Sequence, residues 1–361
     1  MTQVQSLAHV FAPKPSPSSV LFGQLGTVCR RRGHPGLAEN LASLAVWIAG
    51  DLADFQAELS SVERGAGVVR ESAAHLLDLG GKHLRPMCVA LAAKLGGGFS
   101  EPARQLAVAV ELVHAATLLH DDVIDLGDRR RGAAAARIIY GNAASIFAGD
   151  WLLVEALRRI RRAQIPTLLD FMLAIIEEMI LAESVQLEQR GNIDATLDDY
   201  FRVVEGKTAA LFRWAMVAGG RAGGLGDSEC AALDKFGENL GVAFQAIDDL
   251  LDVAGDPSAV GKSLLSDVRE GKMTYPLRIA LGREPSLSPT LSRCAQLGGD
   301  IAEADARHII TTIVDTGAVE ACRELASTRV SDAIAAIAAI PESPGKAALI
   351  TVAKAMLHRE R

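Results

Sequence analysis

Four long segments of this chain carry apolar residues at spacings of three and four, which is the period of one face of an α-helix. They are residues 41–59, 101–125, 171–189 and 229–253. Clusters of glycine and proline separate such segments, as in LGGGFSEP, AGGRAGGLGD and IPESPG. No segment of useful length alternates apolar and polar residues as a half-buried strand would. A chain with this pattern has to bury its apolar stripes by packing helix against helix.

The composition agrees with a helical core in one large domain. Hydrophobic residues make up 49% of the 361 residues and aromatic residues only 4%. Alanine is frequent, which favours close-packed helices over sheets. No internal linker or fixed-period repeat divides the chain. We therefore predict a flexible N-terminal extension at residues 1–38 and a single all-α domain at residues 39–361.

Charge, cysteine spacing and hydropathy argue against several classes of protein. The formal net charge of −7 makes nucleic acid an unexpected partner. The five cysteines form no CxxC pair, so neither a disulfide framework nor a zinc site is indicated. No apolar run reaches the roughly 18–20 residues that a membrane span needs. The sequence also lacks a GxGxxG motif after a strand, a P-loop and an HExxH motif.

The first 38 residues contain no Asp or Glu, but include Lys14 and the arginine run Arg30 to Arg32. This composition is typical of a mitochondrial transit peptide. No convincing amphipathic helix is visible there, however, and a disordered extension of a bacterial protein also explains it. We therefore expect a cytoplasmic protein, with a mitochondrial location as the alternative.

The segment LLHDDVIDLGDRRRG places four acids directly after an apolar helix. Asp121 and Asp125 are four residues apart on one helix face, where like charges are destabilising unless a cation lies between them. A solvated helix end would also tolerate them. The same DDxxD spacing recurs in AIDDLLDVAGD, however, with Asp248, Asp249 and Asp252 at the end of a second apolar helix. Two such carboxylate sets indicate a hard-cation site, and Mg²⁺ typically takes one or two carboxylates together with substrate phosphates.

Basic residues flank both acid motifs, and a magnesium-bound diphosphate would still carry negative charge for them to bind. Taken alone, each is an ordinary surface charge. Jointly they indicate two anion pockets, one served through metal and one served directly by basic side chains. They are Lys82, Arg85, Arg130, Arg131, Lys207, Lys262 and Lys272, with Thr208 beside Lys207.

Six motifs in order make the chain resemble the trans (all-E) polyprenyl diphosphate synthases, specifically the long-chain bacterial octaprenyl and heptaprenyl type. They are GGKHLRP, LLHDDVIDLGDRRRG, GNAASIFAGD, GKTA, FQAIDDLLD and GKSLLSDVREGKMTYPL. The resemblance implies an isoprenoid-synthase-type helical bundle around a deep central cavity, usually in a homodimer. It also implies a chain-elongating reaction, in which an allylic diphosphate ionises and isopentenyl diphosphate attacks the carbocation. A proton is then lost and pyrophosphate leaves.

The resemblance also implies roles for individual residues. Mg²⁺, or alternatively Mn²⁺, would be held by Asp121, Asp125 and Asp248, with Asp252 as support. The allylic diphosphate would be held by Arg130, Lys207, Thr208, Gln245, Lys262 and Lys272. Isopentenyl diphosphate would be held by Lys82, Arg85, His114 and Arg131, although His114 alone would be interpreted as a satisfied helix histidine. The predicted catalytic set is Asp121, Asp122, Asp125, Asp248, Asp249, Asp252 and Lys207.

Two positions depart from the family pattern. His83 stands where arginine is common, and Ser266 stands where an acid is common beside Asp267. We expect both departures to affect rate and affinity more than the type of reaction.

Small residues near the first motif predict a long product. Val113 and Thr117 share the helix face of Asp121 at 100° per residue. Short-chain family members carry an aromatic residue four or five positions before the first Asp, where this chain has Thr117 and Ala116. Neither side chain can block a growing tail, so we expect a long polyprenyl chain such as those of quinones. Small residues also simply permit helix packing, and a short- or medium-chain (C15–C20) synthase is the alternative.

Three other classes of protein compete with this interpretation. A terpene cyclase also uses DDxxD on helices but needs no isopentenyl diphosphate pocket, so GGKHLRP and the second DDxxD argue against it. A subunit of a heteromeric prenyl synthase that acts mainly through interaction tends to lose the acids, which this chain retains. An acidic structural helical protein would leave the ordered basic motifs unexplained.

Overall fold

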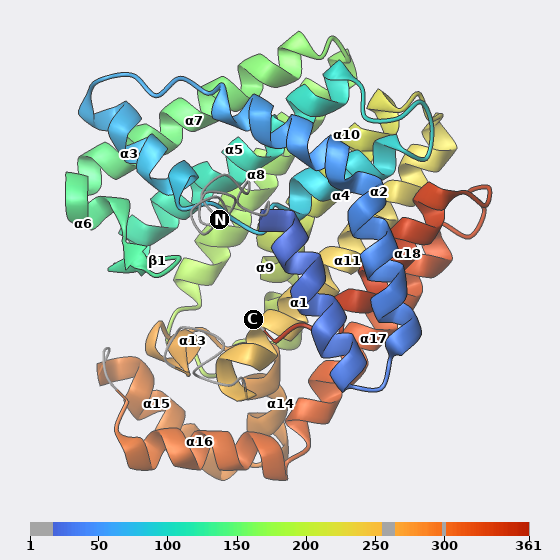
Figure 1. The fold of residues 1–361 in the computed structure, drawn as a ribbon. Coiled ribbons are helices and arrows are strands. Elements are labelled where there is room, and N and C mark those ends of the chain that lie inside the picture. The colour runs from blue at the N-terminus through green and yellow to red at the C-terminus, as the bar shows by residue number, and fades with distance from the viewer. Residues whose placement is uncertain (1–16, 255–263, 298–300, 361) are drawn as a thin grey trace, which may run out of the picture.

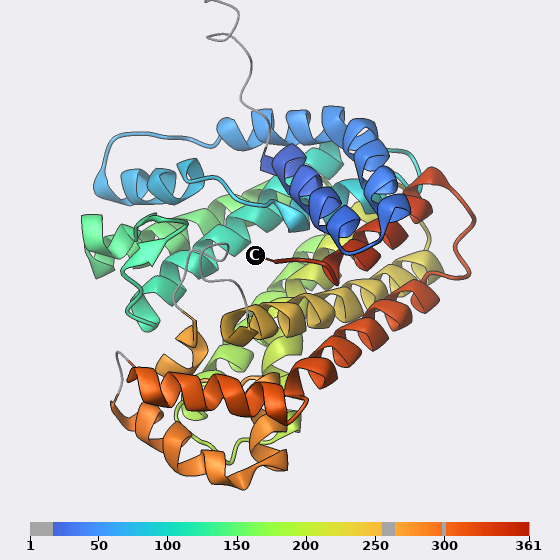
Figure 2. The same cartoon turned by 60° about the horizontal axis from the view of Figure 1, so that its bottom comes forward.

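A computed structural model describes residues 17–254, 264–297 and 301–360 of the chain. The described residues form a bundle of helices with one short hairpin, in which β1 (Arg129–Arg130) pairs antiparallel with β2 (Ala133–Ala134). The all-α architecture predicted from the sequence is confirmed (Figures 1 and 2). None of the described helices is both long and apolar enough to cross a membrane.

The helices of the first half are α1 (Pro17–Arg31), α2 (Pro35–Ser60), α3 (Val68–Asp78), α4 (Leu84–Ala93), α5 (Glu101–Ile124), α6 (Ala136–Tyr140), α7 (Asn142–Arg162) and α8 (Pro166–Glu188). Those of the middle are α9 (Leu197–Val204), the π-helix η1 (Glu205–Ala209), α10 (Ala210–Ala222) and α11 (Asp227–Ala254). Those of the last part are α13 (Ser266–Arg269), α14 (Tyr275–Arg283), the 3₁₀-helix η2 (Pro285–Leu287), α15 (Ser288–Leu297), α16 (Glu303–Asp315), α17 (Ala318–Ala336) and α18 (Pro344–Met356). The four segments predicted as helices fall in α2, α5, α8 and α11.

Two long helices, α5 and α11, form the centre of the bundle and each carries one acid motif at its C-terminal end. Helix α5 packs against α4, α7 and α10, and α11 packs against α10 and α17. Glycine permits this close packing, because a Cβ on Gly237 of α11 would lie 2.8 Å from the Cα of Arg213 in α10. The sequence therefore packs the two motif-bearing helices against a shared neighbour, α10.

The N-terminal part of the chain differs from the prediction. Residues 1–16 lie outside the described residues, but residues 17–38, which we predicted to be flexible, form α1 and the start of α2. Phe22, Leu25 and Cys29 of α1 are buried in the core. The apolar residues of α1 are too few for a clear periodic pattern, so the sequence alone did not reveal this packing. The domain boundary at residue 38 stays a prediction.

Candidate active site

The first acid motif lies in the last turn of α5. Asp121 and Asp125 are half-buried, whereas the Asp122 side chain is only 1% exposed. Asp122 accepts a hydrogen bond of 2.9 Å from Nε of Arg130 on β1. Asp122 therefore anchors the hairpin that follows the motif, because it binds the side chain of Arg130.

In the second motif, on α11, the three acids have different surroundings. Asp249 is buried and accepts hydrogen bonds from the Tyr200 hydroxyl (2.8 Å) and from Nε2 of Gln245 (2.7 Å). Oε1 of Gln245 in turn accepts a hydrogen bond of 2.8 Å from Thr208. Burial raises the pKa of Asp249, and the two neighbouring acids of the motif add to that effect. Asp249 thus orients Gln245 rather than facing solvent.

The third acid of this motif, Asp252, holds the first residues of α13. It accepts hydrogen bonds from the backbone N–H groups of Ser266 (3.0 Å) and Asp267 (3.1 Å). Ser266, the departure noted in the sequence, therefore binds Asp252 directly. The predicted role of Asp252 in supporting the metal ligands stays a prediction.

Cationic side chains contact each of the three predicted metal ligands. Nζ of Lys207 lies 3.7 Å from Asp121, and Nζ of Lys272 lies 3.3 Å from Asp125. Asp125 also pairs with Arg190, and Asp248 accepts a hydrogen bond of 2.7 Å from Arg359. Arg190 and Arg359 were not predicted from the sequence, because they lie 65 and 111 residues from their partners.

The donor set suits a hard divalent cation, although it is not a preformed metal site. No three His, Cys, Asp or Glu side chains of the described residues are grouped so that they could hold an ion. All the candidate ligands are carboxylate oxygens, however, as Mg²⁺ prefers. Burial raises the pKa of Asp121, partly offset by Lys207, and nearby Glu183 and Asp125 raise it further. Added positive charge would stabilise these ionised acids, so the residues fit the ion.

A π-helix positions Lys207 and Thr208. In η1, the backbone of Gly206 lies so close to α8 that a Cβ would meet the Cβ of Ala182 at 2.6 Å. A π-helix inserts an extra residue into a helix and often occurs at functional sites. This local widening of the helix places Lys207 and Thr208 of the GKTA motif beside one cavity. The sequence alone did not predict the π-helix.

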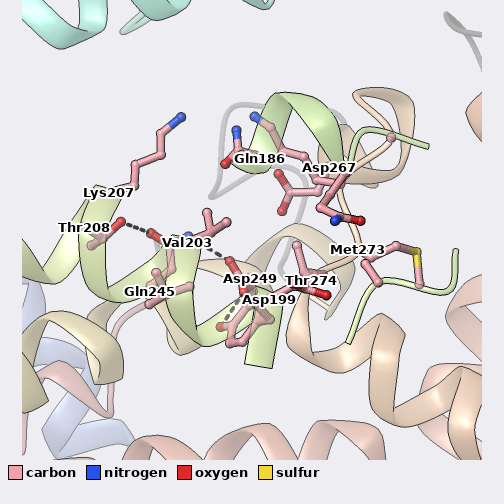
Figure 3. Close-up of a pocket in the computed structure, with 16 residues that line it drawn as sticks. Gln186, Asp199, Val203, Lys207, Thr208, Gln245, Asp249, Asp267, Met273 and Thr274 are labelled. Carbon is pink, nitrogen blue, oxygen red and sulfur yellow. Dashed lines mark hydrogen bonds between the residues drawn. The ribbon is translucent and has the colours of Figure 1, made fainter. Parts of the chain in front are cut away.

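That cavity has a volume of about 170 Å³ and lies between η1, α11 and the segment that precedes α14 (Figure 3). Figure 3 shows Lys207, Thr208, Gln245 and Asp249 along one wall and Asp267 and Thr274 along another. Lys272 also lines the cavity. Of the residues predicted for the allylic diphosphate, Lys207, Thr208, Gln245 and Lys272 are therefore brought together. Lys262 lies outside the described residues.

A second group of basic residues surrounds the start of α4. The guanidinium of Arg85 lies 4.7 Å from the centre of the Phe212 ring. Arg131 lies directly over Gly81, where a Cβ would meet Nη2 at 2.8 Å, so the GG of the motif leaves room for it. Lys82 is exposed in the loop before α4. Burial and the nearby Arg85 lower the pKa of His114 to about 3, which keeps its ring neutral.

One buried acid, Glu111 of α5, faces this basic group. Nδ1 of His83 lies 3.1 Å from Glu111, and both side chains are at most 5% exposed. Burial opposes the ionisation of Glu111, but His83, with help from Arg131, lowers its pKa to about 2. His83 therefore serves as the partner of a buried carboxylate, a role that the sequence did not indicate.

The residues predicted to control chain length do not line the described cavity. Val113 and Ala116 are fully buried, and Thr117 is half-buried and donates a hydrogen bond of 2.8 Å to the carbonyl of His114. Their proposed role along the path of a growing chain stays a prediction.

The chain is similar to known proteins in both sequence and structure. The sequence profile described as Polyprenyl synthetase matches residues 67–313. The chain is 33% identical to octaprenyl diphosphate synthase of Escherichia coli over 89% of this chain and 100% of that protein. It is 31% identical to heptaprenyl diphosphate synthase component 2 of Geobacillus stearothermophilus over 86% of this chain and 96% of that protein. Among solved structures, a polyprenyl synthase from Caulobacter crescentus superposes with a TM-score of 0.83 at 33% identity, covering 88% of this chain and 97% of that one.

Proposed function

Since the chain belongs to the polyprenyl synthetase family, we propose that it is a chain-elongating prenyltransferase. It condenses isopentenyl diphosphate with an allylic diphosphate and releases an all-trans polyprenyl diphosphate of long chain. The observation that carries this proposal is the presence of two distinct cationic groups beside two acid motifs. A terpene cyclase needs only one of these groups.

The reaction balances with these two substrates alone. The C–O bond of the allylic diphosphate breaks and its electron pair leaves with pyrophosphate. The double bond of isopentenyl diphosphate forms a new C–C bond to the allylic carbon, and loss of a proton restores a double bond. Cations fixed beside the leaving group lower the barrier because negative charge develops there.

We assign the cavity beside η1 to the allylic diphosphate. Lys207 and Lys272 contact Asp121 and Asp125 and lie next to the cavity, so both can turn to diphosphate oxygens. Thr208 and Gln245 are oriented by the chain of hydrogen bonds that ends at Tyr200. These residues bind and orient the starter before it ionises.

The second group, Lys82, Arg85, His114 and Arg131, would hold isopentenyl diphosphate directly. Arginine presents a planar fork of donors that matches a diphosphate. A neutral His114 can donate one hydrogen bond without adding charge. Glu111 and His83 stabilise the arrangement of this group, because both side chains are buried beside it.

Asp121, Asp125 and Asp248 would hold Mg²⁺, with Mn²⁺ as a possible substitute. When bound, the ion supplies positive charge that stabilises the leaving diphosphate. The polyprenyl synthase from Caulobacter crescentus is complexed with calcium and isoprenyl diphosphate in its crystal structure, so a divalent cation accompanies the ligand in that protein. Asp249 and Asp252 act indirectly, because Asp249 orients Gln245 and Asp252 holds the first residues of α13.

A long product agrees with the small residues Val113, Ala116 and Thr117 and with the names of two relatives that match most of the chain, an octaprenyl and a heptaprenyl diphosphate synthase. An aromatic ring at position 116 or 117 would stand one turn below Asp121, since an α-helix rises about 5.4 Å per turn. Neither position carries one. We therefore propose a product of quinone side-chain length rather than a C15–C20 product.

Exposed apolar side chains on α7 and α8 favour a homodimer. Phe147, Ile180 and Leu181 are 59%, 63% and 60% exposed, and the two helices pack against each other. Large exposed apolar groups of this kind mark association surfaces. Ile180→Glu should therefore convert a dimer to a monomer in light scattering, and an unchanged mass would argue against this surface. If the active form instead requires a different chain, the purified protein will not turn over alone.

Replacing Asp121 or Asp248 tests the catalytic site. Each change to Ala should remove leaving-group stabilisation and lower the rate by roughly a thousandfold or more. Excess EDTA should have the same effect on the parent. Normal turnover in either variant, or in EDTA, would contradict the proposal.

A further inference from the structure

The last residues of the chain reach into the second acid motif. Arg359, just beyond α18, donates from Nη2 to Oδ1 of Asp248 at 2.7 Å. Its side chain is only 2% exposed, and its guanidinium lies 4.0 Å from the centre of the Phe244 ring. We call His358–Glu360 the C-terminal tail. An arginine enclosed in this way is held at the carboxylate, not freely mobile in solvent.

The same tail is bound on its other side by the end of α1 and the turn that joins α1 to α2. Glu360 forms ion pairs with Arg31 and, at 3.5 Å, with Arg32. The rings of His358 and His34 lie 4.5 Å apart. Both views of the molecule show the C-terminus close to α1 (Figures 1 and 2). Two segments more than 300 residues apart in sequence therefore meet beside the active site, since Arg31 and Glu360 are 329 positions apart.

We propose that the end of α1 and the turn after it, residues 31–34, form a strap that holds the C-terminal tail where Arg359 competes with a divalent cation for Asp248. This inference rests on the proposed function, in which Asp248 is a metal ligand. In addition, the two ends of the chain would together regulate the affinity of the site for the metal ion. Both ends lie outside residues 67–313, which the family profile matches.

Competition follows from the position of the contact. Oδ1 of Asp248 cannot donate fully to a metal ion while it accepts from Arg359 at 2.7 Å. The guanidinium also places a positive charge beside the site and repels a second cation. Binding of the ion through Oδ1 therefore requires the tail to move, and each contact that holds the tail lowers the apparent metal affinity.

The ion pairs of the strap should lower the metal affinity only slightly, whereas Arg359 should lower it strongly. The side chains of Arg31 and Arg32 are 64% and 38% exposed, so their ion pairs with Glu360 are weak. Exposed pairs contribute about 0.2–1 kcal/mol, which corresponds to an increase in metal affinity of up to about fivefold when they are removed. Loss of a charge-assisted bond such as Arg359 to Asp248 corresponds to roughly tenfold or more.

The test is direct binding of Mn²⁺ to the full chain, followed by electron paramagnetic resonance without substrates. Arg31→Gln with Arg32→Gln should tighten binding about two- to fivefold, and Arg359→Gln should tighten it by roughly tenfold. Combining all three changes should add little to Arg359→Gln, because both act through one contact. Arg359→Lys, which retains the charge, should stay closer to the parent. Arg30→Gln removes another exposed arginine of α1 and is the matched control, with no expected change.

Deuterium uptake by the tail provides a second measurement, because the tail and Mn²⁺ must affect each other reciprocally. If the tail lowers the affinity for Mn²⁺, then Mn²⁺ must loosen the tail by the same factor. Deuterium uptake by the C-terminal peptide should therefore rise when Mn²⁺ binds, and Asp248→Asn should abolish this response.

The outcomes separate this proposal from the one on which it rests. Absence of Mn²⁺ binding to the parent and to every variant, with inorganic pyrophosphate present to complete the ligands of the ion, would overturn both the metal site and the strap. Binding that the strap and tail variants leave unchanged, or weaken, would overturn the strap alone. Tail uptake that does not respond to bound Mn²⁺ would also overturn it.

Discussion

Arg85 offers a sharp test of the assignment of isopentenyl diphosphate to the second basic group. Its guanidinium stacks 4.7 Å from the centre of the Phe212 ring, which presents its planar fork in a fixed direction. Arg85→Gln should remove one charge-assisted contact to the diphosphate, which contributes about 1.5–3 kcal/mol. The KM for isopentenyl diphosphate should then rise roughly 10- to 150-fold. The KM for the allylic substrate should change far less, because that substrate binds beside η1.

A variant that preserves the charge separates the contribution of the positive charge from that of the stacking on Phe212. Arg85→Lys keeps the positive charge but loses the planar stacking on Phe212, which contributes about 0.5–1 kcal/mol. Its KM for isopentenyl diphosphate should rise only about two- to fivefold. Arg70→Gln removes an arginine that pairs with Glu63 at the surface and is the matched control.

The assay is steady-state kinetics with each substrate varied in turn, on variants whose thermal unfolding matches that of the parent. Unfolding has to be measured because Arg85 is one of the cations near the buried Glu111. Equal increases in both KM values, or an increase only for the allylic substrate, would refute the assignment of the two pockets.

Three further predictions concern stability and product length. Tyr200→Phe leaves the buried Asp249 with one hydrogen bond fewer, so urea unfolding should show a loss of about 1–3 kcal/mol; no loss would argue against this contact. Thr117→Phe should shorten the product towards C15–C20 in a folded enzyme, and an unchanged product length would mean that the chain does not pass Thr117. Because the pKa of Glu111 is lowered to about 2 from 4.5, its ionisation stabilises the fold above pH 4.5, and this contribution is lost as the pH falls towards 2. By pH 3 the free energy of unfolding of the parent should fall by roughly 2 kcal/mol, whereas that of Glu111→Gln should not show this loss. Identical pH profiles would contradict the claim that the surroundings of Glu111 favour its ionised form.

The helices could be predicted from the sequence because their apolar stripes are long and regular. Segments 101–125 and 229–253 correspond to α5 and α11 almost to the residue. Helix α1 was missed, since its packing depends on α2 rather than on its own pattern. The β1–β2 hairpin was also missed, because strands of two residues leave no alternation to detect.

The candidate site was predictable as a set of residue types but not as a set of contacts. The motifs predicted Asp121, Lys207 and Lys272, and the structure places them around a shared space. The sequence could not show that Asp249 is turned towards Tyr200, or that Arg359 reaches Asp248. Those contacts join residues 49 and 111 positions apart, and such pairs depend on how the helices pack.

The central claim, that the chain elongates an allylic diphosphate, is tested most directly by sizing the product. The purified full chain would be incubated with farnesyl diphosphate, radiolabelled isopentenyl diphosphate and Mg²⁺, and the products dephosphorylated and separated by length. We predict a ladder of all-trans polyprenols that extends beyond C20, with one pyrophosphate released for each labelled unit incorporated. Release of pyrophosphate without incorporation of label, or formation of a cyclic hydrocarbon from farnesyl diphosphate alone, would contradict the account.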